Sequence, residues 1–353
     1  LIMAYTTIDK PSDYFNTKLY TGNAGTQSIS GIGFRPDWIW TKGRSGARGH
    51  TLVDVIRGAT KTLETATNTG EETHSNSITS IDSDGFSLGN RNQGNANSET
   101  FVAWNWLASN TTASNENGST TSTVSANTTA GFSIVSYTGA GATTYGHGLG
   151  ATPNVIIIKK RTSDTGNNNW FLYHDKVITA GASNKSFMTL NETGALTSNG
   201  TATTFTSVSS TTFGVGTDDI ISESSHTFIA YCFAEKKGYS KFGSYVGNGN
   251  ADGAFVYTGF KPAWVMVKDS SAAGYNWMMY DNKRLGYNGG SRYLIANESY
   301  AEGGSSDNLM DFTSNGFKLR IANQNINRTN TYIYMAFAES PFVTSSGVPA
   351  CAR

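Results

Sequence analysis

A histidine next to an acidic residue is the pattern in this chain with the clearest chemical potential, because such a pair can form a general base and its orienting partner. It occurs at His174-Asp175. Adjacent strand residues point to opposite faces, so we interpret this pair as structural. The histidines do not recur at equivalent positions in the repeated motifs described below, and the sequence predicts no catalytic residue and no enzyme. The five histidines are His50, His74, His147, His174 and His226.

Two kinds of turn resemble ligand-binding loops. Asp82-Ser-Asp84-Gly85 is similar to the start of a calcium loop, but the acid required at the end of that loop is missing. The segments GIGFRP, from Gly31, and GHGLG, from Gly146, are rich in glycine, as phosphate-binding loops are. Neither has the lysine after the second glycine or a following helix. We therefore expect tight turns here, with no metal and no cofactor.

Aromatic residues are candidates for binding sugars or for filling a core. Tyr145, Tyr275 and Tyr287 lie in Gly/Asn-rich loops, where an amphipathic ring can stack on a sugar, so they are the candidate glycan-contacting residues. Trp38 and Trp40 share one face of a predicted strand, and the corresponding positions elsewhere in the chain hold other apolar residues, aliphatic ones among them. Replacement of tryptophan by an aliphatic residue indicates core packing.

Five sequence landmarks recur three times in the same order and define the elements that must position these residues. A Gly-rich turn with a proline leads into an apolar run ending in lysine at GIGFRPDWIWTK, GHGLGATPNVIIIK and VYTGFKPAWVMVK. A Tyr-Thr/Val-Gly step precedes each run, and HTLVD, WFLYHD or WMMYD follows it. SDGFSLG, STTFGVG or SNGFKLR comes next, and TFVAWNWLA, TFIAYCFAE or TYIYMAFAE closes the unit. The prolines, Pro36, Pro153 and Pro262, are 117 and 109 residues apart, which is far beyond a solenoid period and predicts three homologous domains.

The repeated runs have the composition of strands and turns. They are short, rich in β-branched and aromatic residues, and bounded by Gly, Asn, Ser and Asp. In TFIAYCFAE neither face is polar, which predicts a strand covered on both sides. We expect an all-β protein of three tandem antiparallel β-sandwich domains, jelly-roll or lectin-like, of about 100 residues each. Trp38, Val155 and Trp264, each two residues after its proline, should be buried in equivalent cores.

The predicted boundaries follow the repeats and the composition between them. Residues 109–130 are dominated by Ser, Thr and Asn and contain one branched aliphatic residue, which predicts a flexible linker or an extended strap. The second and third repeats are joined without such a spacer, so we expect these two in a fixed relation and the first free to swing. The predicted organisation is an N-terminal arm (1–13), β-sandwich repeat 1 (14–108), a Ser/Thr/Asn-rich linker (109–130), repeat 2 (131–242), repeat 3 (243–343) and a C-terminal tail (344–353).

Composition argues against several classes of partner. Basic and acidic residues number 26 each, so there is no basic excess for binding nucleic acid or an anionic membrane surface. The apolar runs are too short to span a membrane. Cys232 is expected to be a small buried side chain and Cys351 an incidental thiol in the tail, without a disulfide.

The sequence combines an extracellular character with no visible export signal. Tandem β-domains rich in Gly, Ser, Thr and Asn are typical of proteins that work outside a cell. The first residues, LIMAYTTIDKPSDYF, show no charged region followed by an apolar stretch. Both features fit a virus particle that assembles in the host cytoplasm and leaves the cell by lysis.

Several segments resemble a family of tandem-repeat virion proteins of marine bacteriophages, cyanophages among them, that are labelled tail fibre or structural proteins. These segments are AYTTIDKPSDYFNTKLYTGN, GFRPDWIWTK, SDGFSLG, GYSKFGSYVGNG and YIYMAFAESPF. The resemblance covers the chain from Ala4 to about Phe342. It implies a non-enzymatic virion structural protein on the particle surface, as a capsid decoration, fibre or tail component, with host attachment among its roles. It supplies no catalytic residue and no ligand.

The expected partners follow from this interpretation. Other virion proteins are expected, together with self-association, for which a trimer is favoured; the three units also allow a monomer to imitate three subunits on a threefold position. The alternative function is a carbohydrate-binding adhesin that recognises a host surface glycan. No nucleic acid and no membrane partner is expected.

Overall fold

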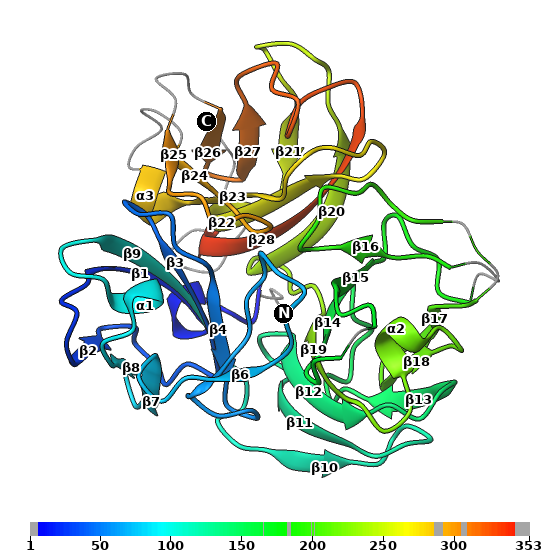
Figure 1. The fold of residues 1–353 in the computed structure, drawn as a ribbon. Helices are drawn as coiled ribbons and strands as arrows, with labels where there is room; N and C mark the ends of the chain where they lie inside the picture. Colours follow the sequence, from blue (N-terminus) through cyan, green and yellow to red (C-terminus); the bar gives the residue numbers. More distant parts are fainter. Residues whose placement is uncertain are drawn as a thin grey trace, which may run out of the picture.

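The computed structural model describes residues 6–164, 166–181, 185–198, 200, 202–285, 292–304 and 309–342. Within these residues the secondary structure is almost entirely antiparallel β-strand, which confirms the all-β prediction. Figure 1 shows three lobes, coloured blue to cyan, green, and yellow to red, around a common centre. Tyr287, Cys351 and the predicted tail 344–353 lie outside the described residues.

The first repeat contains a larger sheet of order β1-β9-β3-β4 and a smaller one of order β2-β8-β7, and β5 pairs with β6. The elements are η1 (Pro11–Asp13), β1 (Phe15–Thr21), β2 (Gln27–Ser30), β3 (Trp38–Gly43), β4 (Thr51–Asp54), β5 (Lys61–Thr62), β6 (Glu72–Thr73), β7 (Ile78–Asp82), β8 (Gly85–Leu88), α1 (Asn92–Asn95) and β9 (Thr100–Trp106).

The second repeat has a larger sheet of order β10-β11-β12-β19-β14-β15-β16 and a smaller one of order β13-β18-β17. The elements are β10 (Ala113–Asn115), β11 (Ser122–Asn127), β12 (Phe132–Thr138), β13 (Thr143–Gly146), β14 (Val155–Lys160), β15 (Trp170–His174), β16 (Met188–Thr189), β17 (Phe205–Val208), β18 (Thr212–Val215), α2 (Asp219–Ser222) and β19 (Thr227–Phe233).

The third repeat has a larger sheet of order β20-β28-β22-β23-β24-β25 and a smaller one of order β21-β27-β26. The elements are β20 (Ser240–Val246), β21 (Phe255–Tyr257), β22 (Phe260–Asp269), β23 (Met278–Asp281), α3 (Asn282–Leu285), β24 (Arg292–Ile295), β25 (Gly303–Gly304), β26 (Met310–Thr313), β27 (Gly316–Leu319) and β28 (Thr331–Pro341).

The same pairing scheme recurs in all three repeats. In each, the first long strand pairs with the last, the last pairs with the strand that carries the apolar run, and that strand pairs with the next one along the chain. The register matches as well, as three equivalent pairs of opposite residues demonstrate: Trp38–Trp106, Val155–Phe233 and Trp264–Phe337. The repeated sequence therefore corresponds to a repeated strand arrangement.

Each repeat is a two-layer structure with apolar side chains between its larger and smaller sheets. In the first repeat, Ile39 and Val53 of the larger sheet belong to one buried cluster with Ile78, Phe86 and Leu88 of the smaller sheet. The second and third repeats have clusters built from the corresponding strands. This supports a sandwich-like description, while the jelly-roll or lectin-like type stays a prediction.

The other face of each larger sheet is buried in a core that the three repeats share. Trp38, Val155 and Trp264 are all at most 2% exposed, as predicted, but they belong to one continuous cluster and not to separate cores. The Trp38 ring stacks on Tyr231 of the second repeat, with centroids 4.4 Å apart. Because period-two alternation sends neighbouring residues to opposite faces, each strand contributes to its own sandwich and to the common centre.

The segment predicted as a flexible linker, 109–130, is part of the second repeat's larger sheet. It contains β10 and β11, and β11 pairs antiparallel with β12 over residues 123–127. The flexible alternative was wrong because it judged the segment by its lack of apolar surface, whereas the extended course of these strands agrees with the strap alternative. Backbone hydrogen bonds to an existing sheet hold these strands, and they do not depend on apolar side chains.

Glycine and proline occupy positions that the backbone requires. A Cβ atom on Gly22, Gly139 or Gly247, the glycine of each Tyr-Thr/Val-Gly step, would lie no more than 2.2 Å from a carbonyl oxygen of the facing turn. Pro36 and Pro153 lie in loops just before β3 and β14, as expected. Pro262 instead lies inside β22, at a register shift, where its missing N–H does not interrupt the pairing.

We predict that Trp38→Ala destabilises the whole molecule and not the first repeat alone. The side chain lies in the core that the three repeats share, so its truncation leaves a cavity in that core, with an expected loss of about 3–5 kcal/mol in the free energy of unfolding. Scanning calorimetry should record a single transition, shifted to lower temperature. Val246→Ala, at a side chain 64% exposed, is the control and should change little. Separate melting of one repeat would contradict a shared core.

Candidate functional site

Polar side chains that could do chemistry are concentrated at the junctions between repeats. The lysine that ends each apolar run, Lys42, Lys159 or Lys268, is almost completely buried. Lys42 Nζ donates to the carbonyl oxygen of Ser299 in the third repeat at 3.0 Å. Lys159 likewise donates to a carbonyl of the first repeat, and Lys268 to one of the second. Each lysine therefore reaches the neighbouring repeat, and the three contacts run in one direction around a closed ring.

A ring N–H makes a second, equivalent contact at each junction. The residues that open the HTLVD, WFLYHD and WMMYD motifs are His50, Trp170 and Trp277. Trp170 Nε1 donates to the carbonyl of Glu64 in the first repeat at 2.8 Å, and Trp277 Nε1 to that of Thr189 in the second at 2.8 Å. His50 Nε2 lies 2.9 Å from the carbonyl oxygen of Ile295 in the third repeat.

A backbone hydrogen bond completes the repeated set. The N–H groups of Glu71, Leu196 and Glu302 donate across the three junctions to carbonyl oxygens at 2.7, 2.9 and 2.7 Å. The same three kinds of contact thus join every neighbouring pair of repeats. This recurrence makes the molecule a closed, pseudo-threefold ring.

Two junctions also contain a buried chain of alternating charges. In the first repeat, Asp54 forms an ion pair with Arg57, both with fully buried side chains, and accepts the hydroxyl hydrogen of Tyr231 from the second repeat at 2.8 Å. Arg57 faces Glu71, which in turn binds Arg161 of the second repeat at 2.8 Å. Such a chain satisfies every buried charge with an opposite partner, which is what makes burial tolerable.

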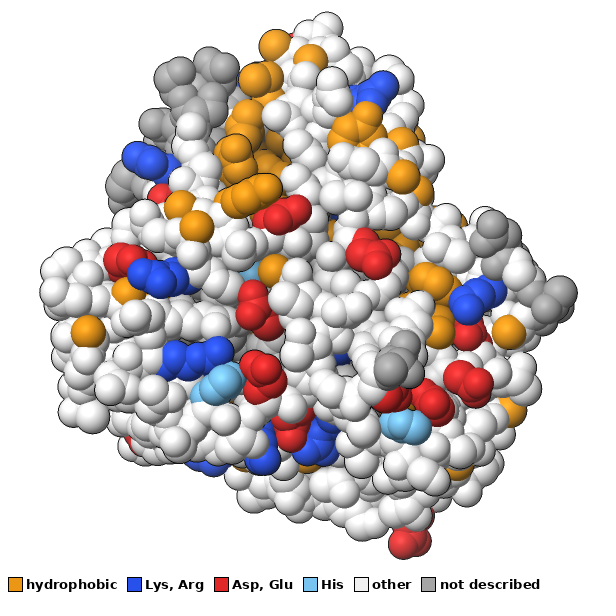
Figure 2. All heavy atoms as spheres, viewed as in Figure 1, with side chains coloured by type: hydrophobic (Ala, Val, Ile, Leu, Met, Phe, Trp, Pro, Cys, Tyr) orange, Lys and Arg blue, Asp and Glu red, His pale blue; other side chains and the backbone are white. Residues whose placement is uncertain are grey.

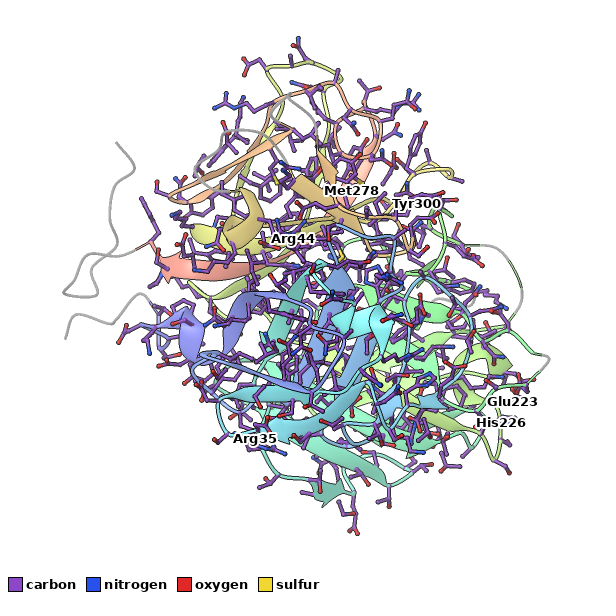
Figure 3. The ribbon with its side chains drawn as sticks, turned by 60° about the vertical axis from the view of Figure 1, so that its left-hand side comes forward. Arg35, Arg44, Glu223, His226, Met278 and Tyr300 are labelled. Atoms are coloured by element: carbon purple, nitrogen blue, oxygen red, sulfur yellow. The ribbon has the colours of Figure 1, made fainter. Side chains whose placement is uncertain are left out.

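The junction between the third and first repeats has the same arrangement. Asp281 pairs with Arg284 and accepts from Trp104 Nε1 at 3.0 Å, and Arg284 faces Glu302, which binds Arg44. Figure 3 shows Arg44 at this junction and Tyr300 at the third-repeat side of the molecule. At the junction of the second and third repeats, His174 takes the place of the aspartate, and its Nε2 lies 3.3 Å from the carbonyl oxygen of Tyr334.

Burial determines the protonation of these junction residues. It lowers the pKa of Lys159 to about 7 and the pKa values of Lys42 and Lys268 to about 8. Burial also lowers the pKa of His50 to about 3. The geometry agrees, because His50 Nδ1 accepts the indole N–H of Trp40 at 2.7 Å and has no room for a proton of its own. Neutral His50 therefore bridges two groups by hydrogen bonds, accepting from Trp40 and donating to the carbonyl of Ile295.

The adjacent pair His174-Asp175 is closer than strand alternation predicts. His174 Nδ1 lies 3.5 Å from Asp175 Oδ1, because β15 ends at His174 and the chain turns directly afterwards. The prediction that the two side chains diverge was therefore wrong. His174 is nonetheless fully buried, and burial lowers its pKa to about 4. A buried ring bonded to a backbone carbonyl supports the structural interpretation of the pair.

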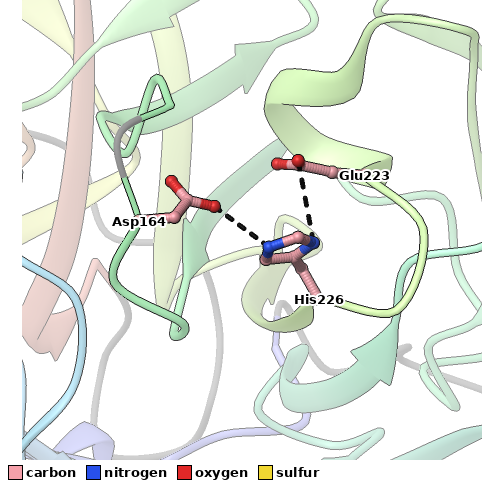
Figure 4. Close-up of side chains that lie close together, drawn as sticks. All are labelled: Asp164, Glu223 and His226. Carbon is pink, nitrogen blue, oxygen red and sulfur yellow. Dashed lines mark ion pairs between the residues drawn. The ribbon is translucent and has the colours of Figure 1, made fainter.

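Asp164, Glu223 and His226 form a surface cluster that the sequence did not indicate. Their ligand-type atoms lie within 4.8 Å of one another, the geometry expected of metal ligands. His226 Nε2 lies 3.0 Å from Asp164 Oδ2, and its Nδ1 3.8 Å from Glu223 Oε1 (Figure 4). Figure 3 places Glu223 and His226 side by side at the periphery, far from Arg44. Asp164 is 59 residues from Glu223 and 62 from His226 along the chain, so only the fold brings it to the other two.

A lysine already supplies the positive charge in this cluster. Lys160 Nζ lies 2.5 Å from Glu223 Oε2 and 3.0 Å from Asp164 Oδ2. Its hydrogen bond holds the pKa of Asp164 below the ordinary value. Both nitrogens of the His226 ring face oxygen atoms, Asp164 on one side and the carbonyl of Ser224 on the other. An ammonium group in this position competes with any metal ion, so the cluster is better explained as an ion-pair network.

Two pockets among the described residues are too small for a substrate. A polar pocket of about 50 Å³ is lined by Glu64, Glu72, Arg91 and Gln93, and a second of about 60 Å³ lies near Phe15. Spaces of that size hold a few water molecules. A larger, open groove of about 360 Å³ is lined by Thr26, Gln27, Ser28, Thr79, Ser87 and Leu88. Its lining contains no aromatic ring on which a sugar could stack.

One of the tyrosines proposed for glycan contact, Tyr145, is excluded by its burial. Tyr145 lies in β13, not in a loop, and is fully buried with its hydroxyl bonded to the carbonyl of Thr138, which excludes it from a surface site. The sequence misplaced it because only one side of the strand is apolar. Tyr275 lies in a partly exposed loop with the guanidinium of Arg328 5.3 Å from its ring centre. Tyr287 lies outside the described residues.

The Asp82–Gly85 segment is a tight turn between β7 and β8, as predicted. Asp84 accepts the N–H groups of Gly31 and Gly33 at 2.9 and 2.6 Å, and Asp82 accepts from Ser80 and Ser87. Both carboxylates are therefore satisfied by the protein itself. Cys232 is buried, as expected, with its thiol pKa raised by burial.

Comparison with known proteins identifies a family but not an activity. The chain belongs to a family described as a domain of unknown function, DUF7483, whose model matches residues 10–341. This single match spans all three repeats, in agreement with the shared core. Neither the curated proteins nor the solved structures compared with the chain include a significant match. No helix among the described residues is long and apolar enough to cross a membrane.

We predict that acid destabilises the protein partly through His50. Its folded pKa of about 3 lies below the ordinary value of 6.5, so the unfolded chain takes up the proton first as the pH falls below about 6.5. Stability contributed by neutral His50 is lost over this range by up to about 1.4 kcal/mol per pH unit. Urea denaturation at about pH 7 and about pH 5 measures the loss.

His50→Gln should reduce that loss, because an amide can accept from Trp40 and donate to the carbonyl without titrating. Val246→Ala is the control, since it changes an exposed side chain that does not titrate, and it should keep the wild-type pH dependence. An unchanged pH dependence in His50→Gln would contradict the role of His50.

We predict that Lys160→Met converts the Asp164 cluster into a cation site. Methionine preserves most of the buried stem but removes the ammonium group that neutralises both carboxylates. Titration calorimetry with Zn²⁺ should reveal binding at least about tenfold tighter than in wild type, a change of about 1.4 kcal/mol. Lys176→Met, which removes an ammonium bound to Asp175 elsewhere, should produce no gain. Equal affinity in wild type and Lys160→Met would contradict the proposed competition.

Proposed function

We propose that this member of the DUF7483 family is a non-enzymatic structural protein of a bacteriophage particle, exposed on the particle surface as a capsid decoration, fibre or tail component. The observation that carries the proposal is the closed ring of three equivalent units within one chain. The resemblance of the sequence to tandem-repeat virion proteins adds the biological setting. In this view the protein assembles in the host cytoplasm and is released with the particle.

The ring geometry suits a position of threefold symmetry. One chain presents three similar lobes around a centre, as a trimer of smaller subunits would, and particles offer such positions repeatedly. This favours a monomer that imitates a trimer over the homo-trimer expected from the sequence. We propose that the lobes arose as copies of one lectin-like β-sandwich, since the register of equivalent strands matches.

The placement of the ionisable groups supports a structural role. Asp54 and Arg57 form one ion pair with fully buried side chains, and Asp281 and Arg284 form another. The two aspartates also accept hydrogen bonds from side chains of the neighbouring repeats. A general base must be within reach of a substrate proton, which a fully buried ion pair is not. The chemistry-bearing residues thus serve to hold repeats together, and other virion proteins are the proposed partners.

Mass spectrometry of purified particles tests the proposal directly. Peptides of this chain should be present in particles of the virus that encodes it, at a copy number matching a set of symmetry-related positions. Gold-labelled antibody should then mark either the capsid or the tail in electron micrographs.

A host-cell lysate cleared of particles is the matched control, and the protein should be depleted from it relative to the particle fraction. Absence of the chain from washed particles would contradict a virion role. Turnover of a host polysaccharide by the purified protein would contradict the non-enzymatic assignment.

A further inference from the structure

All large hydrophobic side chains that are strongly exposed among the described residues belong to the third repeat. They are Val246, Phe255, Tyr257 and Tyr300, with exposed fractions between 47% and 64%. Figure 2 shows hydrophobic side chains gathered on the corresponding lobe. Phe255 and Tyr257 lie two residues apart on one face of β21, with buried Val256 between them. We call this pair, on the outermost strand of its sheet, the aromatic edge.

The three repeats have different side chains at the outward positions of the strand equivalent to β21. The register pairs Ile29, Tyr145 and Val256 with a phenylalanine of the neighbouring strand, so these three residues are equivalent. The flanking outward positions hold Ser28 and Ser30 in the first repeat, Thr144 and Gly146 in the second, and Phe255 and Tyr257 in the third. Exposed serine side chains are well hydrated, whereas two exposed aromatic side chains on an edge strand are a feature of binding surfaces.

In the second repeat, an extended segment of the same chain covers this edge. Thr120 N–H donates to the carbonyl of Thr144 at 3.1 Å, and Thr120 forms a parallel bridge with Tyr145. Ser122 Oγ donates to the carbonyl of Gly146 at 2.7 Å. The segment therefore uses the outward carbonyl groups of β13 as a further strand would.

The same carbonyl groups of β21 point away from its sheet. The carbonyl of Ala254 accepts from Leu319 N–H of β27, and the N–H of Thr258 donates to the carbonyl of Asn315 in the turn before β27. Because backbone groups alternate in direction along an antiparallel strand, those of Phe255 and Tyr257 point to the side of β21 that faces away from β27. Lys318, opposite Phe255, is held by Asp252 and the carbonyl of Gly253. Its charge is therefore neutralised beside the edge, and the nearby surface does not repel an apolar partner.

We propose that the aromatic edge binds an extended segment of another polypeptide by strand addition, in the way that residues 119–122 cover β13. The segment would run along β21, donate backbone N–H groups to the carbonyls of Phe255 and Tyr257, and place apolar side chains at alternate positions against the two rings. Main-chain bonds supply affinity in this mode and side-chain contacts supply selectivity. The proposal depends on the fold alone and does not require the chain to be a virion protein.

Selection from a displayed library of random peptides on the immobilised full-length protein tests the proposal. The recovered peptides should share alternating apolar residues, and each is then synthesised and its affinity measured by titration. Phe255→Ser/Tyr257→Ser, which reproduces the side chains of the first repeat, should weaken binding by at least about tenfold, since an aromatic contact is worth a factor of that size. Both side chains are exposed, so this variant should fold.

Two controls separate strand addition from non-specific adhesion. Ser28→Thr/Ser30→Thr changes the equivalent edge of the first repeat and should leave peptide affinity unchanged. Replacing the peptide residue that donates to the Phe255 carbonyl by proline should abolish binding, because proline has no N–H. Hydrogen exchange at the amides of Phe255 and Tyr257 should slow when peptide is bound.

The proposal would be overturned if no peptide is recovered, or if the recovered peptides bind the Phe255→Ser/Tyr257→Ser variant as tightly as wild type. A wild-type dimer in solution that dissociates on Phe255→Ser/Tyr257→Ser would overturn the assigned partner in favour of a second copy. Virion mass spectrometry can fail without affecting any of these outcomes, so the two proposals are tested separately.

Discussion

Closure of the ring is the constraint on which the rest of the structure depends. Each larger sheet has one face covered by its own smaller sheet, while the other face would be exposed to water without the two neighbouring repeats. Five aromatic rings meet where these faces converge, with centroids between 4.4 and 6.0 Å apart in the contacts they make with one another: Trp38, Trp106, Trp264, Phe233 and Phe337. Aromatic contacts of this kind add to the free energy of burial. A repeat removed from the ring would expose this apolar face to water.

Polar contacts give the ring its direction. The buried lysines and ring N–H groups of one repeat always reach the same neighbour, so the contact surfaces are head-to-tail, and such surfaces close only when the rotation per unit fits the number of units. The junctions differ in how much charge they bury. Two junctions each contain a buried ion pair, Asp54–Arg57 in one and Asp281–Arg284 in the other. In the third junction His174 and Val177 occupy the corresponding positions. A buried ion pair and an uncharged contact can therefore serve the same place.

The sequence predicts local structure far better than it predicts how the repeats combine. The apolar runs, the turn at Asp84 and the burial of Trp38 follow from alternation and turn chemistry, which act over a few residues. The shared core could not be predicted, because an apolar face looks the same whether a second sheet or a neighbouring repeat covers it. Lys42 and its equivalents could be recognised only as the last residues of strands. Nothing in the local sequence indicates that their ammonium groups donate to carbonyl oxygens of another repeat. The Asp164 cluster was missed for the same reason, as its members meet only through the fold.

The shared core has a consequence for how the chain is made. Synthesis proceeds at about 5–20 residues per second, so on the order of ten to fifty seconds separate the emergence of Trp106 from that of Phe337. During that interval the tryptophans of the first repeat have no partners from the third, and a large apolar face is open to other molecules in the cell. The nascent chain should therefore depend on chaperones until its last strand, β28, enters between β20 and β22. Evolution of such a ring from a single ancestral unit would first have required that unit to assemble with copies of itself.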